Sequence, residues 1–266
     1  MAGLVHSVQG IWAISVVAQV AVFGLLLFKG HFRKLPAFTA YLAVNICQMG
    51  FLYFVYARFG FSSHTALMLA WLSEAGTLIL RILATTEVLW LVLRPYPGIW
   101  GLGWRVLAVA FFVVLSYAAI EAGQNISAAI GLADRGFHLA FAVALVACLV
   151  IIRYYSIPVD PPYKVLLGGF CAYSCAIVLA NTIGHALFLR GFANIKPIWQ
   201  LTTIAAYAGV QGAWAVGLWK AAPARQVRPA LLGTSVYWQI SPQINKRLRL
   251  LNGQLGKFWG AKAARQ

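Results

Sequence analysis

Seven apolar stretches of membrane-spanning length dominate this sequence of 266 residues. A hydrocarbon core of about 30 Å is crossed by about 20 apolar residues in a helix. Backbone polar groups in lipid must be paired within the segment, so such stretches predict helices. Charged residues make up only 10% of the chain, which excludes an ordinary soluble domain. The sequence therefore predicts an all-α polytopic membrane protein with seven transmembrane helices, at about 8–28, 37–57, 64–93, 105–122, 134–156, 164–189 and 196–220.

Basic residues are enriched beside alternate stretches, which predicts the orientation of the helices. Cytoplasmic connections carry the excess of lysine and arginine. The basic residues after the first, third, fifth and seventh stretches are Lys29, Arg33, Lys34, Arg94, Arg105, Arg153, Lys164 and Lys220. The other connections hold only Arg58, Arg135, Arg190 and Lys196. We therefore expect the N-terminus outside and the C-terminus in the cytoplasm.

The segment 221–266 differs from the transmembrane domain 1–220, because it is basic and contains an amphipathic pattern. Apolar residues recur at helical spacing from about 242 to 260, and Lys246, Arg249 and Lys257 occupy the opposite side. This pattern is typical of a helix lying in the membrane interface, where anionic lipids attract basic residues. Docking on a partner protein is the alternative. The net charge of +16 lies mostly on the predicted cytoplasmic side, which favours lipid and not nucleic acid.

The stretch 64–93 contains Glu74, Arg81 and Glu87, although the whole chain has only five acidic residues. An ionisable side chain at bilayer depth costs about 2.5–3.5 kcal/mol on insertion scales, and it normally faces the protein interior. At 100° per residue, Glu74 and Arg81 share a sector of roughly 80° with Thr77 and Thr85, which we call the charged ridge. Glu87 points about 140° away from Glu74. The ridge predicts either a functional cavity or a structural ion network.

Other stretches also carry a polar face. One face of 37–57 bears Tyr41, Asn45 and Gln48, one of 164–189 includes Asn181, and one of 196–220 includes Thr203, Tyr207 and Gln211. Because 105–122 and 134–156 are apolar at their centres, we expect them toward lipid. Small residues Ala205, Gly209, Gly212 and Ala213 predict close approach of a neighbouring helix. The candidate ligand-binding residues are Glu74, Thr77, Arg81, Gln48, Asn181, Gln211 and Tyr207.

Two histidines form a second candidate site. His138 and His185 each lie about four residues inside the predicted outer end of their stretch. Paired histidines on neighbouring helices can hold a transition metal or haem. The alternative is that both are structural, because their spacing matches no recognised ligand motif.

Three sequence segments resemble a family. The segments FRKLPAFTAYL (32–42) and AWLSEAG (70–76), followed by Glu87 and RPYP (94–97), are similar to a group of uncharacterised seven-helix bacterial inner-membrane proteins. The resemblance implies that Glu74 and Glu87 are family features. It implies no activity.

Three functions follow from these features. The leading hypothesis is a small-ligand or ion site in the polar interior, serving transport or sensing. The second is an accessory subunit of a larger membrane complex, favoured by short connections and a basic tail. The third is an electron carrier that binds haem or metal through His138 and His185. No catalytic motif is present in the sequence, so it assigns no catalytic residue and names no cofactor.

Overall fold

Helices account for the regular structure of the described chain. The computed structural model describes residues 2–60, 63–123, 126–154, 157, 159–190, 195–221 and 249–255. Its elements are α1 (Ala2–Phe28), the short 3-10 helix η1 (His31–Arg33), α2 (Pro36–Phe59), α3 (His64–Leu93), α4 (Pro97–Ala122), α5 (Ile126–Tyr154), α6 (Pro161–Leu189) and α7 (Ile195–Lys220). A short helix also covers 249–255. The predicted all-α class is confirmed.

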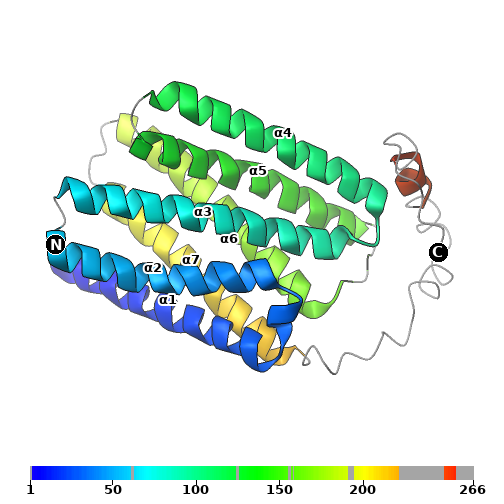
Figure 1. Ribbon diagram of the computed structural model, residues 1–266, viewed down its shortest axis with the longest axis horizontal. Helices are drawn as coiled ribbons and strands as arrows, with labels where there is room; N and C mark the ends of the chain where they lie inside the picture. Colours follow the sequence, from blue (N-terminus) through cyan, green and yellow to red (C-terminus); the bar gives the residue numbers. More distant parts are fainter. Residues whose placement is uncertain are drawn as a thin grey trace.

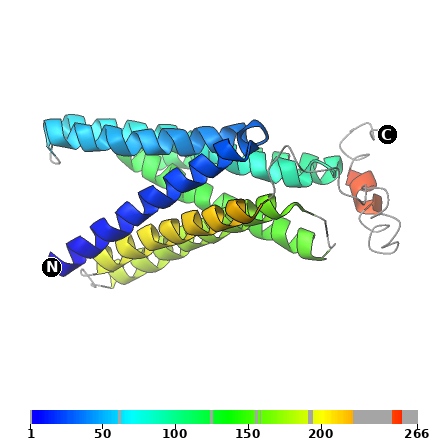
Figure 2. The ribbon, with the colours of Figure 1, turned by 90° about the horizontal axis from the view of Figure 1, so that it is seen from below.

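The long helices form one bundle in which successive helices run in opposite directions (Figure 1). We call the end at which α1, α3, α5 and α7 begin the first end, and the opposite end the second end. α3 is central, because it packs against α2, α4, α5 and α6. α1 packs chiefly against α7, so helices far apart in sequence are neighbours. Figure 2 shows α1 crossing the bundle obliquely between α2 and α7.

Five helices of the described chain are long and apolar enough to cross a membrane. They are Pro36–Phe59, His64–Leu93, Pro97–Ala122, Ala128–Tyr154 and Pro161–Gly184. Their outward faces carry large apolar side chains, as in α4, where Phe112 is 74% and Ile120 is 80% exposed. These are the helices of a multi-pass membrane protein, since such surfaces suit contact with lipid. Seven spans and the orientation stay predictions.

α4 and α5 show the largest differences from the predicted boundaries, because each begins eight residues earlier than the sequence predicted. α4 starts at Pro97 instead of 105, because proline fits the first turn of a helix, where its missing N–H removes no bond. α5 starts at Ile126 instead of 134, which places Asp134 inside the helix. Because Asp134 is charged, the sequence suggested that it belongs to a connection between helices. In the structure it forms an ion pair with Arg81.

The carboxylate of Glu87 caps a helix other than its own. α2 begins at Pro36 after Leu35, which provides no side-chain cap. Glu87 of α3 accepts hydrogen bonds from the backbone N–H groups of Ala37 at 3.1 Å and Phe38 at 2.9 Å. The first N–H groups of a helix have no partner within it, and a negative charge there is favourable. Glu87 therefore stabilises the start of α2.

Close helix contacts occur at glycines other than the expected ones. A Cβ atom on Gly217 of α7 would lie 2.5 Å from Val165 of α6, and a Cβ on Gly169 would collide with the indole of Trp214. The same atom on Gly209 or Gly212 would meet nothing within 4 Å. The prediction that these last two glycines admit a neighbour is therefore wrong.

The basic tail is described only at 249–255. This short helix contacts the bundle, because Asn252 Oδ1 accepts a hydrogen bond of 2.9 Å from the backbone N–H of Gly98 in the first turn of α4. Leu250 is 56% exposed, whereas Leu255 packs against the core. The rest of the predicted interfacial helix, including Lys246 and Lys257, lies outside the described residues. Its binding to anionic lipid stays a prediction.

Candidate functional site

A polar cavity of about 390 Å³ lies between the centre of the bundle and its first end. Six helices contribute to its wall, and most of the lining side chains are polar. They are Ser15, Asn45, Met49, Glu74, Arg81, Asp134, Tyr173, Ile177, Asn181, Thr203, Ile204 and Tyr207. Two carboxylates and one guanidinium are therefore gathered around one space, which we call the polar cavity.

Arg81 is the hub of the charges around the polar cavity. Its Nη1 donates to Asp134 Oδ1 at 3.0 Å and to His138 Nε2 at 3.1 Å. Its Nη2 donates to Glu74 Oε1 at 3.4 Å. The Arg81 side chain is 13% exposed, and its guanidinium lies 6.0 Å from the ring centroid of Tyr173. α3 and α5 are thus joined by an ion network, which both interpretations of the charged ridge allow.

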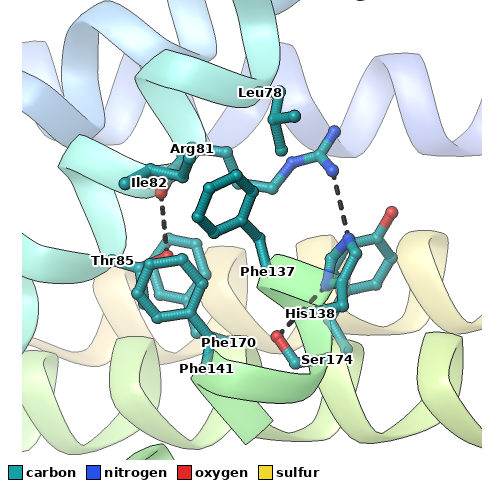
Figure 3. Close-up of a pocket in the computed structure, with 10 residues that line it drawn as sticks. Leu78, Arg81, Ile82, Thr85, Phe137, His138, Phe141, Phe170 and Ser174 are labelled. Carbon is teal, nitrogen blue, oxygen red and sulfur yellow. Dashed lines mark hydrogen bonds between the residues drawn. The ribbon is translucent and has the colours of Figure 1, made fainter. Parts of the chain in front are cut away.

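The contact with Arg81 defines the protonation of His138. A guanidinium can only donate, so His138 Nε2 must accept and carries no proton. Its Nδ1 then holds the ring proton and lies 3.4 Å from Ser174 Oγ of α6 (Figure 3). The imidazole is therefore neutral and links α3, α5 and α6.

Beneath Arg81 the interior becomes apolar. A pocket of only about 10 Å³ lies there, and Figure 3 shows Phe137, Phe141 and Phe170 around it. Arg81 lines both this pocket and the polar cavity. The guanidinium of Arg81 thus forms the floor of the polar cavity, and the aromatic rings fill the interior of the bundle below it.

Glu74 stands at the more accessible side of the network. Its side chain is 38% exposed, against 27% for Asp134. Gln48 of α2 donates to Glu74 Oε2 at 3.3 Å and to Ser73 Oγ at 3.1 Å, so it positions this carboxylate. Thr77 is buried and its hydroxyl donates to the backbone oxygen of Glu74 at 2.9 Å.

The opposite wall is built from an amide and two phenol rings. Asn45 of α2 donates to the hydroxyl of Tyr207 of α7 at 2.6 Å. The ring of Tyr207 meets that of Tyr173 edge to face, with centroids 5.4 Å apart. Aromatic rings and polar oxygens therefore line the same cavity as the carboxylate of Glu74.

The structure gathers only part of the predicted ligand set. Glu74, Arg81, Asn181 and Tyr207 line the polar cavity, and Gln48 contacts Glu74. Thr77 does not line the cavity. Gln211 is fully buried outside the lining, and within the described chain its amide atoms have no hydrogen-bond partner.

Asp134 was missed as a site residue. The expectation that the fifth stretch faces lipid is wrong at this point, because Asp134 and His138 of α5 both contact Arg81. The signal was their spacing of four residues, which puts both on one helix face. α4 faces outward as expected, with most of its surface exposed.

The two histidines do not share a depth. His138 is level with Ser174 of α6, whereas His185 lies eleven residues further along that helix, about 16 Å at 1.5 Å per residue. The side chain of His185 lies outside the described ones. The described side chains include no group of three metal-ligating residues. A metal or haem site at this pair stays a prediction that the position of His138 does not support.

No family model matches this chain, and no curated protein or solved structure is significantly similar to it. The resemblance of its first three helices to seven-helix bacterial proteins stays a proposal. Function must be inferred from the geometry of the polar cavity.

Proposed function

We propose that this protein binds a small ligand in the polar cavity, for transport or sensing across a bacterial inner membrane. The supporting observation is that all the charges of the network border one open space of about 390 Å³. Ligand cavities are commonly about 300–1,000 Å³ and hold a few convergent polar groups. A purely structural ion network needs no adjoining space, and it gains nothing from leaving Glu74 38% exposed.

With the predicted orientation, this site faces the outer side of the membrane. Basic residues such as Lys29, Arg33 and Arg94 lie at the second end, which the distribution of positive charge assigns to the cytoplasm. The polar cavity lies toward the first end, so the ligand enters from outside. Sensing requires only binding there. Transport also requires the aromatic rings beneath Arg81 to move.

Accessibility to a charged thiol reagent tests this proposal. In a background with Cys47, Cys148, Cys171 and Cys175 replaced by serine or alanine, we compare Asn181→Cys with Leu179→Cys on the same helix. Asn181 lines the polar cavity, whereas Leu179 is 59% exposed on the outer surface of the bundle. Because Asn181 also borders a second pocket between α4, α5 and α6, Thr203→Cys, which lines the polar cavity and not that pocket, is labelled in parallel. A membrane-impermeant methanethiosulfonate added to spheroplasts should label Asn181→Cys and leave Leu179→Cys unlabelled, because lipid excludes a charged reagent.

Two results would contradict the proposal. No labelling of Asn181→Cys from outside, or after solubilisation in detergent, would mean that the cavity holds no accessible water and that the network is structural. Equal labelling of both cysteines would show that the bundle surface at this depth is in water. Co-purification of other membrane proteins in stoichiometric amounts, without ligand access to the cavity, would favour an accessory subunit.

A further inference from the structure

We infer that the ligand of the polar cavity is a small organic cation, of the amine or quaternary ammonium class. This inference rests on the proposed function and adds the charge of the ligand to it. Among the lining residues the ionised groups are Glu74, Asp134 and Arg81. Two carboxylates and one guanidinium leave a formal charge of −1, and the neutral imidazole of His138 changes nothing.

The positive charge of Arg81 is not available to a ligand. Its two terminal nitrogens already donate to Asp134, His138 and Glu74. Of its five N–H groups, these contacts leave one on Nη2 and the one on Nε. Nε is buried without a hydrogen-bond partner among the described residues, and no solvent reaches it. An anion would have to break these ion pairs to reach the guanidinium. The fork that usually binds carboxylate or phosphate is therefore occupied.

The negative charge of Glu74, in contrast, is accessible. Both of its hydrogen bonds are long, at 3.4 Å to Arg81 and 3.3 Å to Gln48. Each carboxylate oxygen can accept more than one hydrogen bond, so Glu74 keeps accepting capacity toward the cavity. A cation beside it would complete the charge balance of the site.

The remaining wall suits an organic cation better than a metal ion. The rings of Tyr173 and Tyr207 line the cavity, and the negative face of an aromatic ring attracts an ammonium group. Because the guanidinium of Arg81 already lies over the ring of Tyr173, the ring offered to a ligand is that of Tyr207. A bound Ca²⁺ or Mg²⁺ requires about six oxygen ligands within about 2.6 Å of the ion. The described side chains offer no cluster of three ligating residues, and a space of about 390 Å³ exceeds what a bare ion fills.

Charge-selective labelling tests the inference without knowledge of the natural ligand. The purified protein in neutral detergent carries Asn181→Cys in the cysteine-free background. We compare the rates of a trimethylammonium methanethiosulfonate and a sulfonate methanethiosulfonate, each divided by its rate with a small free thiol. One unit charge at a distance of about 8 Å in an effective dielectric near 40 speeds a cation about fivefold and slows an anion by the same factor. The cationic reagent should therefore be faster than the anionic one by roughly thirtyfold.

Three variants define the origin of the preference. Glu74→Gln should reduce the preference several-fold, Glu74→Asp should retain it, and Glu121→Gln, at an exposed position near the end of α4, should leave it unchanged. Tetramethylammonium should slow labelling of Asn181→Cys, and acetate at the same ionic strength should not.

The outcomes separate this inference from the proposed function. Labelling by both reagents with equal or anionic preference overturns the cationic ligand and leaves the accessible cavity intact. A cationic preference that survives in Glu74→Gln overturns the role of Glu74. Labelling by neither reagent overturns the cavity, and the inference with it.

Discussion

Two glutamates of α3 have different surroundings although both lie in one apolar stretch. Glu74 faces the polar cavity, where Gln48 and Arg81 hold it. Glu87 accepts from the first N–H groups of α2. Helical periodicity predicted that the two side chains point in different directions. It could not predict the partner of Glu87, because that partner is the backbone of another helix. A pattern of side chains does not show which backbone groups need an acceptor from another helix.

Loss of the Glu87 carboxylate should destabilise the bundle without changing the polar cavity. Glu87→Ala removes two charge-assisted hydrogen bonds, each worth about 1.5–3 kcal/mol, and leaves two N–H groups of α2 without their acceptor. We expect a lower midpoint of thermal unfolding in detergent, with unchanged labelling of Asn181→Cys. Glu121→Ala is the matched control, since Glu121 is exposed. Equal midpoints for the two variants would remove the capping role.

Arg81 should be coupled more strongly to Asp134 than to Glu74. Its ion pair with Asp134 is shorter, 3.0 Å against 3.4 Å, and Asp134 is less exposed. Breaking a buried pair from one side costs about 3–5 kcal/mol, because an uncompensated charge is left. We measure thermal stability in two double-mutant cycles. Relative to the sum of the single losses, the double variant Arg81→Met with Asp134→Asn should regain more stability than Arg81→Met with Glu74→Gln. Additive losses in both cycles would show that the three groups do not form one network.

Among the elements, α6 and α7 make the closest contact, and a glycine defines it. Trp214 of α7 is 2% exposed and packs against Phe38 and Phe170, with ring centroids 5.1 Å and 4.8 Å away. The indole occupies the space where Gly169 of α6 has no side chain. The tryptophan is therefore held between α2 and α6.

A methyl group at Gly169 should separate α6 from α7. Overpacking of this kind costs about 1–3 kcal/mol. Gly209→Ala on α7 is the control, because its new Cβ meets nothing within 4 Å and alanine favours a helix by up to about 1 kcal/mol. Thermal unfolding in detergent should shift down for Gly169→Ala and up or not at all for Gly209→Ala. The same shift in both variants would contradict this packing.

The boundaries and contacts of elements show how far the sequence could be interpreted. The long apolar stretches predicted the helices, because length in lipid requires them. The predicted start of α5 was eight residues too late. The charge of Asp134 argued against a helix in lipid, because the sequence does not show which partner pairs with that charge. The sequence also did not identify Gly169 and Gly217 as close contacts. A glycine is necessary there because Trp214 faces Gly169 and Val165 faces Gly217, and a sequence does not show which residues face each other.

At the scale of the whole molecule, the site depends on how six helices converge. The sequence predicted polar faces on α2, α3, α6 and α7, and members of each face line the cavity. It did not predict that α5 and α1 complete the wall through Asp134 and Ser15. Which helices are neighbours is decided by packing of the entire bundle, and no local pattern carries that information.

Reporter fusions should establish the orientation of the bundle. A phosphatase that is active only in the periplasm should be active when fused after Gly60 or Gly123, at the first end, and inactive when fused after Leu35 or Tyr96, at the second end. The reason is the excess of basic residues beside the second end. A fluorescent protein that folds only in the cytoplasm, fused to the C-terminus, is the complementary measurement. Periplasmic activity of a C-terminal fusion would reverse the predicted topology.

Gln19 of α1 and Gln211 of α7 are buried in helices that pack together but are synthesised far apart in time. Both amides are fully buried, and α1 packs chiefly against α7. A ribosome adds about 5–20 residues each second, so roughly 10 to 40 seconds separate the synthesis of these two glutamines. If α1 spans the membrane as the sequence predicts, it does so during that time without α7, the helix against which it chiefly packs. We therefore expect that a chain interrupted before α7 leaves the α1 surface that packs against α7 uncovered.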